Sequence, residues 1–128
     1  MGKFKDLLLG MMALTAASCG QVEGVTTVGA DAFARGIGAD KAQVVDVRTP
    51  EEYASGHIQG AVNIDVMSSE FGQKAQTALD KGTKCYVYCR SGRRSMRAAK
   101  ILAGMGYRVV NLAGGIGAWQ GAGKSIVP

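Results

Sequence analysis

Five short apolar, β-branched runs recur along the chain, and a segment with helical signals separates each run from the next. In order, they are 25–28, 43–47, 61–64, 85–88 and 109–112. Strands that alternate with helices in this way predict an α/β fold, with a central five-stranded, mainly parallel sheet and helices on both faces. Since the chain has 128 residues, it has room for one such domain.

The ends of the intervening helices follow from local signals. We expect helices at 30–37, from 49 onward, at 69–79, at 95–105 and at 114–119. Gly36 and Gly38 should end the first helix, whereas Thr49 and Pro50 suit the start of the second. The helix at 95–105 has the clearest apolar face, and Gly106 should end it.

Three residues that could take part in catalysis or binding lie where strands are expected to end. Asp46 and Arg48 lie at the end of the second run, and Cys89 directly follows the fourth. Ligands of parallel α/β sheets gather at the carboxyl ends of the strands. The pattern therefore predicts one crevice that contains the acid, the arginine and the cysteine.

Most of the chain's net charge of +5 is concentrated around this cysteine. Five basic residues and no acid lie between residues 90 and 100: Arg90, Arg93, Arg94, Arg97 and Lys100. Such a cluster can bind nucleic acid, a membrane surface or a small anion. Because it surrounds a cysteine in a Gly/Ser loop, without interleaved aromatic residues, we expect a small anion and no nucleic acid.

Cys89 is the predicted nucleophile. A loop between a strand and a helix can direct several backbone N–H groups at one anion, and Gly92 can adopt a positive φ. Together with the arginines, these groups should hold the pKa of Cys89 below its free value of about 8.5. Cys85 should be a structural core residue, since about 13 Å of intact strand would separate it from Cys89 and prevent a disulfide.

The first 19 residues have the features of a signal peptide. Lys3 and Lys5 precede an apolar run at 7–17 that is too short to span a bilayer, and small residues lead to Cys19. This resembles a bacterial lipoprotein signal, which implies lipidation of Cys19, a linker at 20–24 and a domain at 25–128. We therefore expect a lipid-anchored protein of the cell envelope or periplasm. A secretory signal without lipid and a packed first helix are the alternatives.

Three stretches, in order, resemble the signatures of the rhodanese family: 46–61, 89–95 and 114–119. The resemblance implies a five-stranded parallel sheet and a sulfurtransferase activity. A thiolate would take sulfane sulfur from thiosulfate or a related anionic donor, hold it as a Cys89 persulfide and pass it to cyanide or a thiol. In the family, the counterparts of Asp46 and Arg48 brace the active-site loop. Substrate binding is expected from Arg90, Ser91, Gly92, Arg93, Arg94 and Ser95.

Loop length distinguishes this activity from a related one. Dual-specificity phosphatases place an arginine after five residues that follow the cysteine, but here that position is Ser95, and the arginine is Arg94. The shorter loop is similar to that of sulfurtransferases and of some arsenate reductases. An oxyanion reductase and a non-catalytic partner-binding module thus stay open as alternatives.

No cofactor is implied, and a metal site is not expected. The only histidine, His57, lies in a turn where a structural role is expected, and the two cysteines of the domain cannot converge. Trp119 is expected in the core. We expect a monomer whose only contact with the membrane is the lipid anchor.

Overall fold

The computed structural model describes residues 22–128, so the predicted signal sequence and Cys19 lie outside the described residues. The strands are β1 (Val25–Val28), β2 (Gln43–Asp46), β3 (Val62–Asn63), β4 (Cys85–Tyr88) and β5 (Val109–Leu112). The helices are α2 (Ala30–Asp40), α3 (Pro50–Ala54), α4 (Phe71–Ala78), α5 (Arg93–Gly104) and α6 (Gly115–Gly121).

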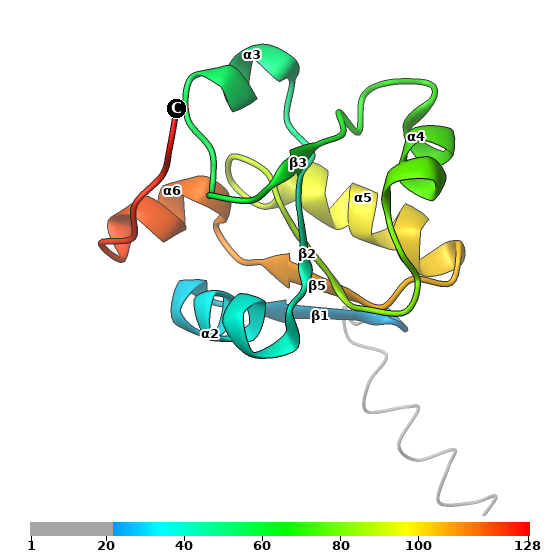
Figure 1. The fold of residues 1–128 in the computed structure, drawn as a ribbon, viewed down its shortest axis with the longest axis horizontal. Coiled ribbons are helices and arrows are strands. Elements are labelled where there is room, and N and C mark those ends of the chain that lie inside the picture. Colours follow the sequence, from blue (N-terminus) through cyan, green and yellow to red (C-terminus); the bar gives the residue numbers. More distant parts are fainter. Residues whose placement is uncertain (1–21) are drawn as a thin grey trace, which may run out of the picture.

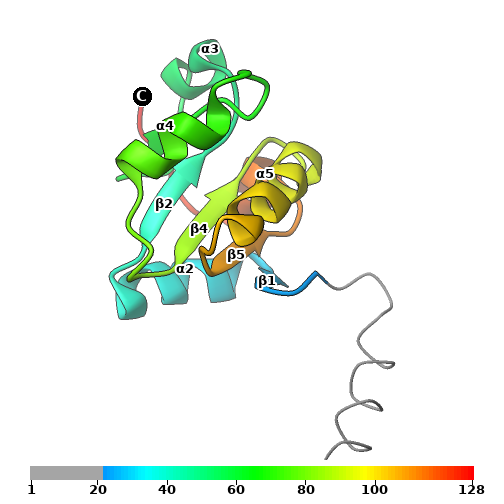
Figure 2. The ribbon, with the colours of Figure 1, turned by 90° about the vertical axis from the view of Figure 1, so that its right-hand side faces the viewer.

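The predicted α/β fold is confirmed. The strands form one five-stranded sheet in the order β1-β5-β4-β2-β3, and all of its strand pairs are parallel. Helices α2 and α6 cover one face and α4 and α5 the other (Figures 1 and 2). Because side chains alternate across a strand, Val45 and Val87 pack in the α4/α5 core, whereas Val44 and Tyr86 pack in the α2/α6 core.

The first helix differs from its prediction. Neither Gly36 nor Gly38 ends α2, which continues to Asp40. The helix ends at Lys41, a residue with φ of 50° whose N–H donates to the carbonyl of Ile37. Gly36 is instead a contact point, because a Cβ atom at this position would collide with the ring and hydroxyl of Tyr86. The glycine lets α2 pack closely on β4, which is a requirement of tertiary packing that local helix signals do not reveal.

The start of α3 agrees with its prediction. The hydroxyl of Thr49 accepts a hydrogen bond from the Glu52 N–H, and the Glu52 carboxylate accepts one from the Thr49 N–H. This reciprocal pair is a capping box, and Pro50 occupies the first position of the helix. The helix is thereby fixed beside the carboxyl end of β2, which ends at Asp46.

Candidate active site

Cys89 lies directly after β4 and is almost completely buried, with 1% of its surface exposed. The chain then turns through Gly92, whose φ of 108° is in the region that favours glycine, and enters α5. The Gly92 N–H donates to the Cys89 Sγ at 3.0 Å, and the thiol contacts the Ser95 Oγ at 3.4 Å. The sulfur thus faces hydrogen-bonding groups at the N-terminus of α5.

These groups determine the ionisation of the cysteine. Burial is the largest influence on Cys89 and by itself raises its pKa. Hydrogen bonds from the Ser95 hydroxyl and from the backbone N–H groups of Ser95, Gly92 and Ser91 act in the opposite direction, and the net result is a lowered pKa. The largest stabilising contributions are therefore these hydrogen bonds rather than the charges of the arginines. The site thus makes the thiolate, the reactive form of cysteine, easier to form than in an ordinary thiol.

The start of α6 fixes the position of the cysteine loop. The Ile116 N–H donates to the Cys89 carbonyl at 2.8 Å, and the Gly117 N–H donates to the Arg90 carbonyl at 3.3 Å. Gly115, with φ of 62°, has no room for a side chain, because a Cβ atom there would lie 2.5 Å from the Cys89 carbonyl oxygen. Gly115 thus lets α6 approach the loop that precedes α5, a role that the sequence did not reveal.

Asp46 and Arg48 form a buried ion pair beside the loop. The Arg48 Nε donates to the Asp46 Oδ1 at 2.9 Å, and its Nη2 donates to the Asp46 Oδ2 at 2.6 Å and to the Gly56 carbonyl at 2.7 Å. The Tyr88 hydroxyl donates to the same carboxylate at 2.7 Å and accepts a hydrogen bond from the Ile58 N–H. The ion pair is thus hydrogen-bonded to Tyr88, the residue before Cys89, and does not contact the arginines of the loop.

The arginines of the loop are in two different environments. Arg90 and Arg93 are exposed, but the half-buried Arg94 forms two hydrogen bonds with the Glu52 carboxylate, at 2.8 and 3.0 Å. This contact with Arg94 is the main reason that the pKa of Glu52 falls to about 2. Glu52 was not among the predicted site residues. No local pattern marks this contact, because the two partners of the ion pair are 42 positions apart.

The remaining predicted site residues surround the sulfur unequally. Ser95 is completely buried against Cys89, whereas the side chain of Ser91 is exposed and its backbone N–H acts on the thiolate. Of the loop, the structure brings Ser91, Gly92 and Ser95 to the sulfur through hydrogen bonds, and it directs Arg94 to α3.

The other cysteine and the histidine lie outside this arrangement. Cys85 is a buried free thiol, and burial is the first cause that raises its pKa to about 11. His57 stacks on Tyr53 with ring centroids 3.7 Å apart, and its backbone pairs with Val127. Trp119 is buried in the α2/α6 core. Within residues 22–128, no cluster of His, Cys, Asp and Glu side chains is suited to hold a metal ion.

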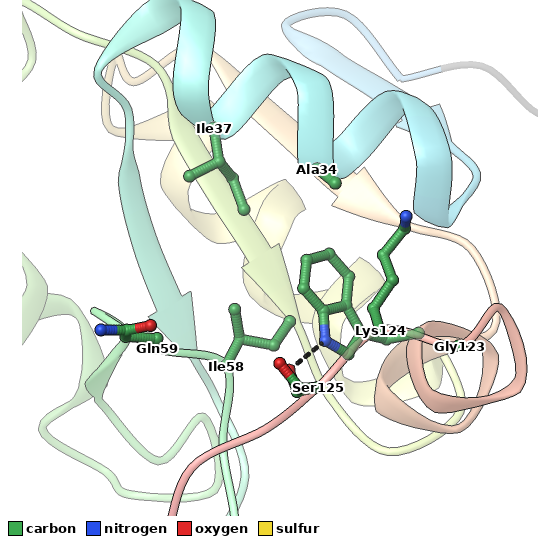
Figure 3. Close-up of a pocket in the computed structure, with 8 residues that line it drawn as sticks. Ala34, Ile37, Ile58, Gln59, Gly123, Lys124 and Ser125 are labelled. Atoms are coloured by element: carbon green, nitrogen blue, oxygen red, sulfur yellow. Dashed lines mark hydrogen bonds between the residues drawn. The ribbon is translucent and has the colours of Figure 1, made fainter.

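A separate pocket of about 430 Å³ opens on the α2/α6 side (Figure 3). Ala34 and Ile37 of α2 line one side, and the loop residues Ile58 and Gln59 line another. Residues 123–125 and the Trp119 indole complete the lining. Its lining contains none of the predicted site residues, so the cysteine and this pocket are distinct places in the fold. In the part of the chain that the structure describes, every helix is too short or too polar to span a membrane.

Comparison with known proteins gives consistent matches. A family model described as Rhodanese-like domain matches residues 29–122. The thiosulfate sulfurtransferase PspE of Escherichia coli is 45% identical over 73 residues, which are 56% of this chain and 68% of that protein. A sulfurtransferase of Allochromatium vinosum is 40% identical over 85 residues, covering 66% of this chain and 77% of that protein. The crystal structure of a rhodanese-related protein from Thermoplasma volcanium superposes with a TM-score of 0.70 at 31% identity, covering 80% of this chain and 97% of that one.

Proposed function

The chain belongs to the rhodanese-like domain family and is a rhodanese-type sulfurtransferase, and on this premise we propose that it moves sulfane sulfur through a persulfide on Cys89. The donor is thiosulfate or a related anion, and the acceptor is cyanide or a thiol. The observation that carries the proposal is the Cys89 Sγ at 3.0 Å from the Gly92 N–H, in a loop whose hydrogen bonds lower the pKa of the thiol.

The reaction consists of two balanced steps. The Cys89 thiolate attacks the outer sulfur of thiosulfate, the S–S bond of the donor breaks, and its electron pair leaves with sulfite. The product is a persulfide anion on Cys89. Cyanide or a thiolate then attacks the outer sulfur, and the electron pair of the persulfide bond returns to Cys89. The N–H groups that stabilise the thiolate stand close enough to stabilise the persulfide anion as well.

The exposed arginines attract the donor. Arg90 and Arg93 flank the cysteine loop and are solvent-exposed, so their charges act on an approaching anion. Arg93→Glu should therefore raise the KM for thiosulfate, and added salt should reduce the effect. An unchanged KM would show that Arg93 has no part in donor binding.

Intact-mass measurement tests the proposal directly. Incubation with thiosulfate should add one sulfur atom to the full chain, cyanide should remove it, and Cys89→Ser should never acquire it. Absence of the adduct would reject the proposal. Turnover of arsenate without an adduct would favour an oxyanion reductase, and partner binding without either would favour a non-catalytic module.

We also propose that residues 1–19 direct the protein to the cell envelope, where Cys19 carries a lipid anchor. The support is the sequence of basic, apolar and small residues that ends at Cys19. Globomycin should cause a precursor to accumulate, and Cys19→Ala should abolish labelling with radioactive palmitate. A chain that shows neither effect has no lipid anchor.

A further inference from the structure

The excess of basic over acidic residues in the chain is matched by one segment. Residues 90–100 contain five of the 15 basic residues and no acid, and the other ten basic residues are matched by the ten acids of the chain. The net charge of +5 thus equals the charge of this segment alone. A surface so uneven in charge attracts anionic partners to one place.

Four of these charges form an exposed basic stripe, which we define as Arg90, Arg93, Arg97 and Lys100. Spacings of four and three residues put Arg93, Arg97 and Lys100 on one face of α5, opposite the buried face that includes Ala99 and Leu102. Within residues 22–128, no member of the stripe takes part in an ion pair. Its charge is therefore available to a partner, unlike that of Arg94.

The stripe is longer than a small donor requires. With a rise of 1.5 Å per residue, Lys100 lies about 10 Å from Arg93 along the helix axis. The Debye length at physiological salt is about 8 Å, so Arg97 and Lys100 add little to the binding of a small anion at Cys89. Charges at this distance suit an anionic partner that is as wide as the helix face.

Exposed apolar side chains accompany the stripe. Met67 is 61% exposed, and its Sδ lies 4.0 Å from the Arg97 Nη1. Ile101, next to Lys100, is 36% exposed. Arginine and methionine together are enriched at protein interfaces, where apolar contacts are ringed by polar groups. This combination favours a protein partner over a bare lipid surface. A lipid surface bound to the stripe would also cover the loop of Cys89, which lies at the end of the stripe.

We infer that the basic stripe docks the sulfur acceptor, a protein with an acidic surface around its own thiol. The inference rests on the proposed sulfur transfer through Cys89. In the transfer, the acceptor thiolate attacks the outer sulfur of the Cys89 persulfide and forms a new S–S bond. The old S–S bond breaks, and its electron pair returns to Cys89, so the acceptor leaves as the persulfide and the enzyme as the thiolate.

Two synthetic peptides of equal length test the docking surface. Each has one cysteine, flanked by glutamates in one peptide and by glutamines in the other. With the full chain loaded by thiosulfate, sulfur transfer to the acidic peptide should be about tenfold faster at low salt, and high salt should remove the difference. In the double variant Arg97→Gln/Lys100→Gln, transfer to the acidic peptide at low salt should be about fivefold slower than in the wild-type chain.

Three controls separate this inference from the proposed function. Transfer to cyanide should be unchanged in the double variant, and Arg35→Gln, which removes an exposed charge of α2, should leave the acidic peptide's rate unchanged. A serine version of the acidic peptide should bind the wild-type chain more tightly than the double variant in fluorescence anisotropy. This binding is measured without loading, so it tests docking even where sulfur transfer itself fails.

Equal rates for the two peptides, or equal binding of the serine peptide by the two chains, would overturn the inference. Vesicles that contain phosphatidylglycerol provide the last comparison. Binding to them that depends on Arg97 and Lys100, without a preference for the acidic peptide, would assign the stripe to a membrane surface and also overturn the inference.

Discussion

Cys85, at the start of β4, and Cys89, directly after its end, are both buried, yet the pKa values of their thiols are shifted in opposite directions. Cys85 begins the strand and Cys89 follows it, and both side chains pack in the α4/α5 core. Burial raises the pKa of Cys85 to about 11, with a smaller contribution from Asp80, whereas the pKa of Cys89 is lowered although burial opposes it. Burial alone therefore makes an inert thiol.

The difference comes from what lies beyond each end of the strand. Near Cys85, the amide of Gln43 approaches the sulfur at 3.5 Å. Near Cys89, the first turn of α5 supplies the hydroxyl of Ser95 and several N–H groups. A residue that follows a parallel strand and precedes a helix lies at the positive end of that helix, so the reactivity of Cys89 follows from its position in the fold.

The largest expected effect is on sulfur loading. Cys89→Ser should lower the rate of thiosulfate–cyanide transfer by at least about a thousandfold, because the nucleophile is lost. Cys85→Ala should load one sulfur atom like the wild-type chain and retain most of the rate. Steady-state kinetics with intact mass of both variants makes the comparison. A sulfur adduct on Cys85 in the Cys89→Ser variant would show that the two thiols are not as different as their surroundings indicate.

Much of this contrast could be predicted from the sequence. The alternation of strands and helices predicted the sheet, and the Gly/Ser loop after the fourth run predicted that the pKa of Cys89 is lowered. The length of strand between Cys85 and Cys89 also predicted that both are free thiols, as the structure shows. These inferences succeeded because they depend on neighbours in the chain, where secondary structure fixes the geometry.

The rest depends on contacts between distant segments. The ion pair between Glu52 and Arg94 joins residues 42 positions apart, and no local pattern marks it. Gly36 and Gly115 are small because other elements approach them closely, which is visible only when Tyr86 and Cys89 are in place. The sequence likewise could not show that Arg94 is directed to α3.

The second prediction uses the alkaline behaviour of Cys85. Its folded pKa, about 11, lies above the value of a free cysteine thiol, so the unfolded chain loses this proton first as pH rises. The protonated Cys85 thiol therefore stabilises the folded chain. This stabilisation is fully present below pH 9 and is lost between about pH 9 and 11. Its size is about 2–3 kcal/mol.

Urea unfolding at pH 8 and pH 11 measures this loss. The free energy of unfolding should fall by about 2–3 kcal/mol less in Cys85→Ala than in the wild-type chain. The comparison between the chains matters because other groups, such as the buried Tyr88 with its raised pKa, titrate in the same direction. Equal losses in both chains would mean that Cys85 is not the group that titrates.

The third prediction concerns a variant that removes one of the hydrogen bonds to the Cys89 thiolate. Ser95→Ala removes the hydroxyl that lies 3.4 Å from the sulfur, and the pKa of Cys89 should rise by about one unit. Iodoacetamide alkylation, followed over pH, should therefore be about tenfold slower below the pKa. Ser91→Ala is the matched control, since its hydroxyl is exposed and its N–H is retained. A shift of equal size in both variants would assign the effect to the loop backbone.

The smallest effect is expected from the ion pair that neutralises Arg94. Glu52→Gln removes the carboxylate charge but keeps a side chain that can complete the capping box with Thr49. The charge of Arg94, which is close enough to Cys89 for the two to interact, then acts on the sulfur and on the donor without compensation. The KM for thiosulfate should fall by about two- to fivefold, with the pKa of Cys89 slightly lower.

Glu51→Gln is the control for the loss of charge alone. Glu51 lies in the same first turn of α3, is exposed and is not the partner of Arg94, so its variant should leave the KM nearly unchanged. Equal effects in the two variants would mean that only the overall charge matters. A higher KM in Glu52→Gln would mean that the carboxylate holds Arg94 in its binding position. In that case, the contrast between the two thiols would depend on α3 as well as on α5.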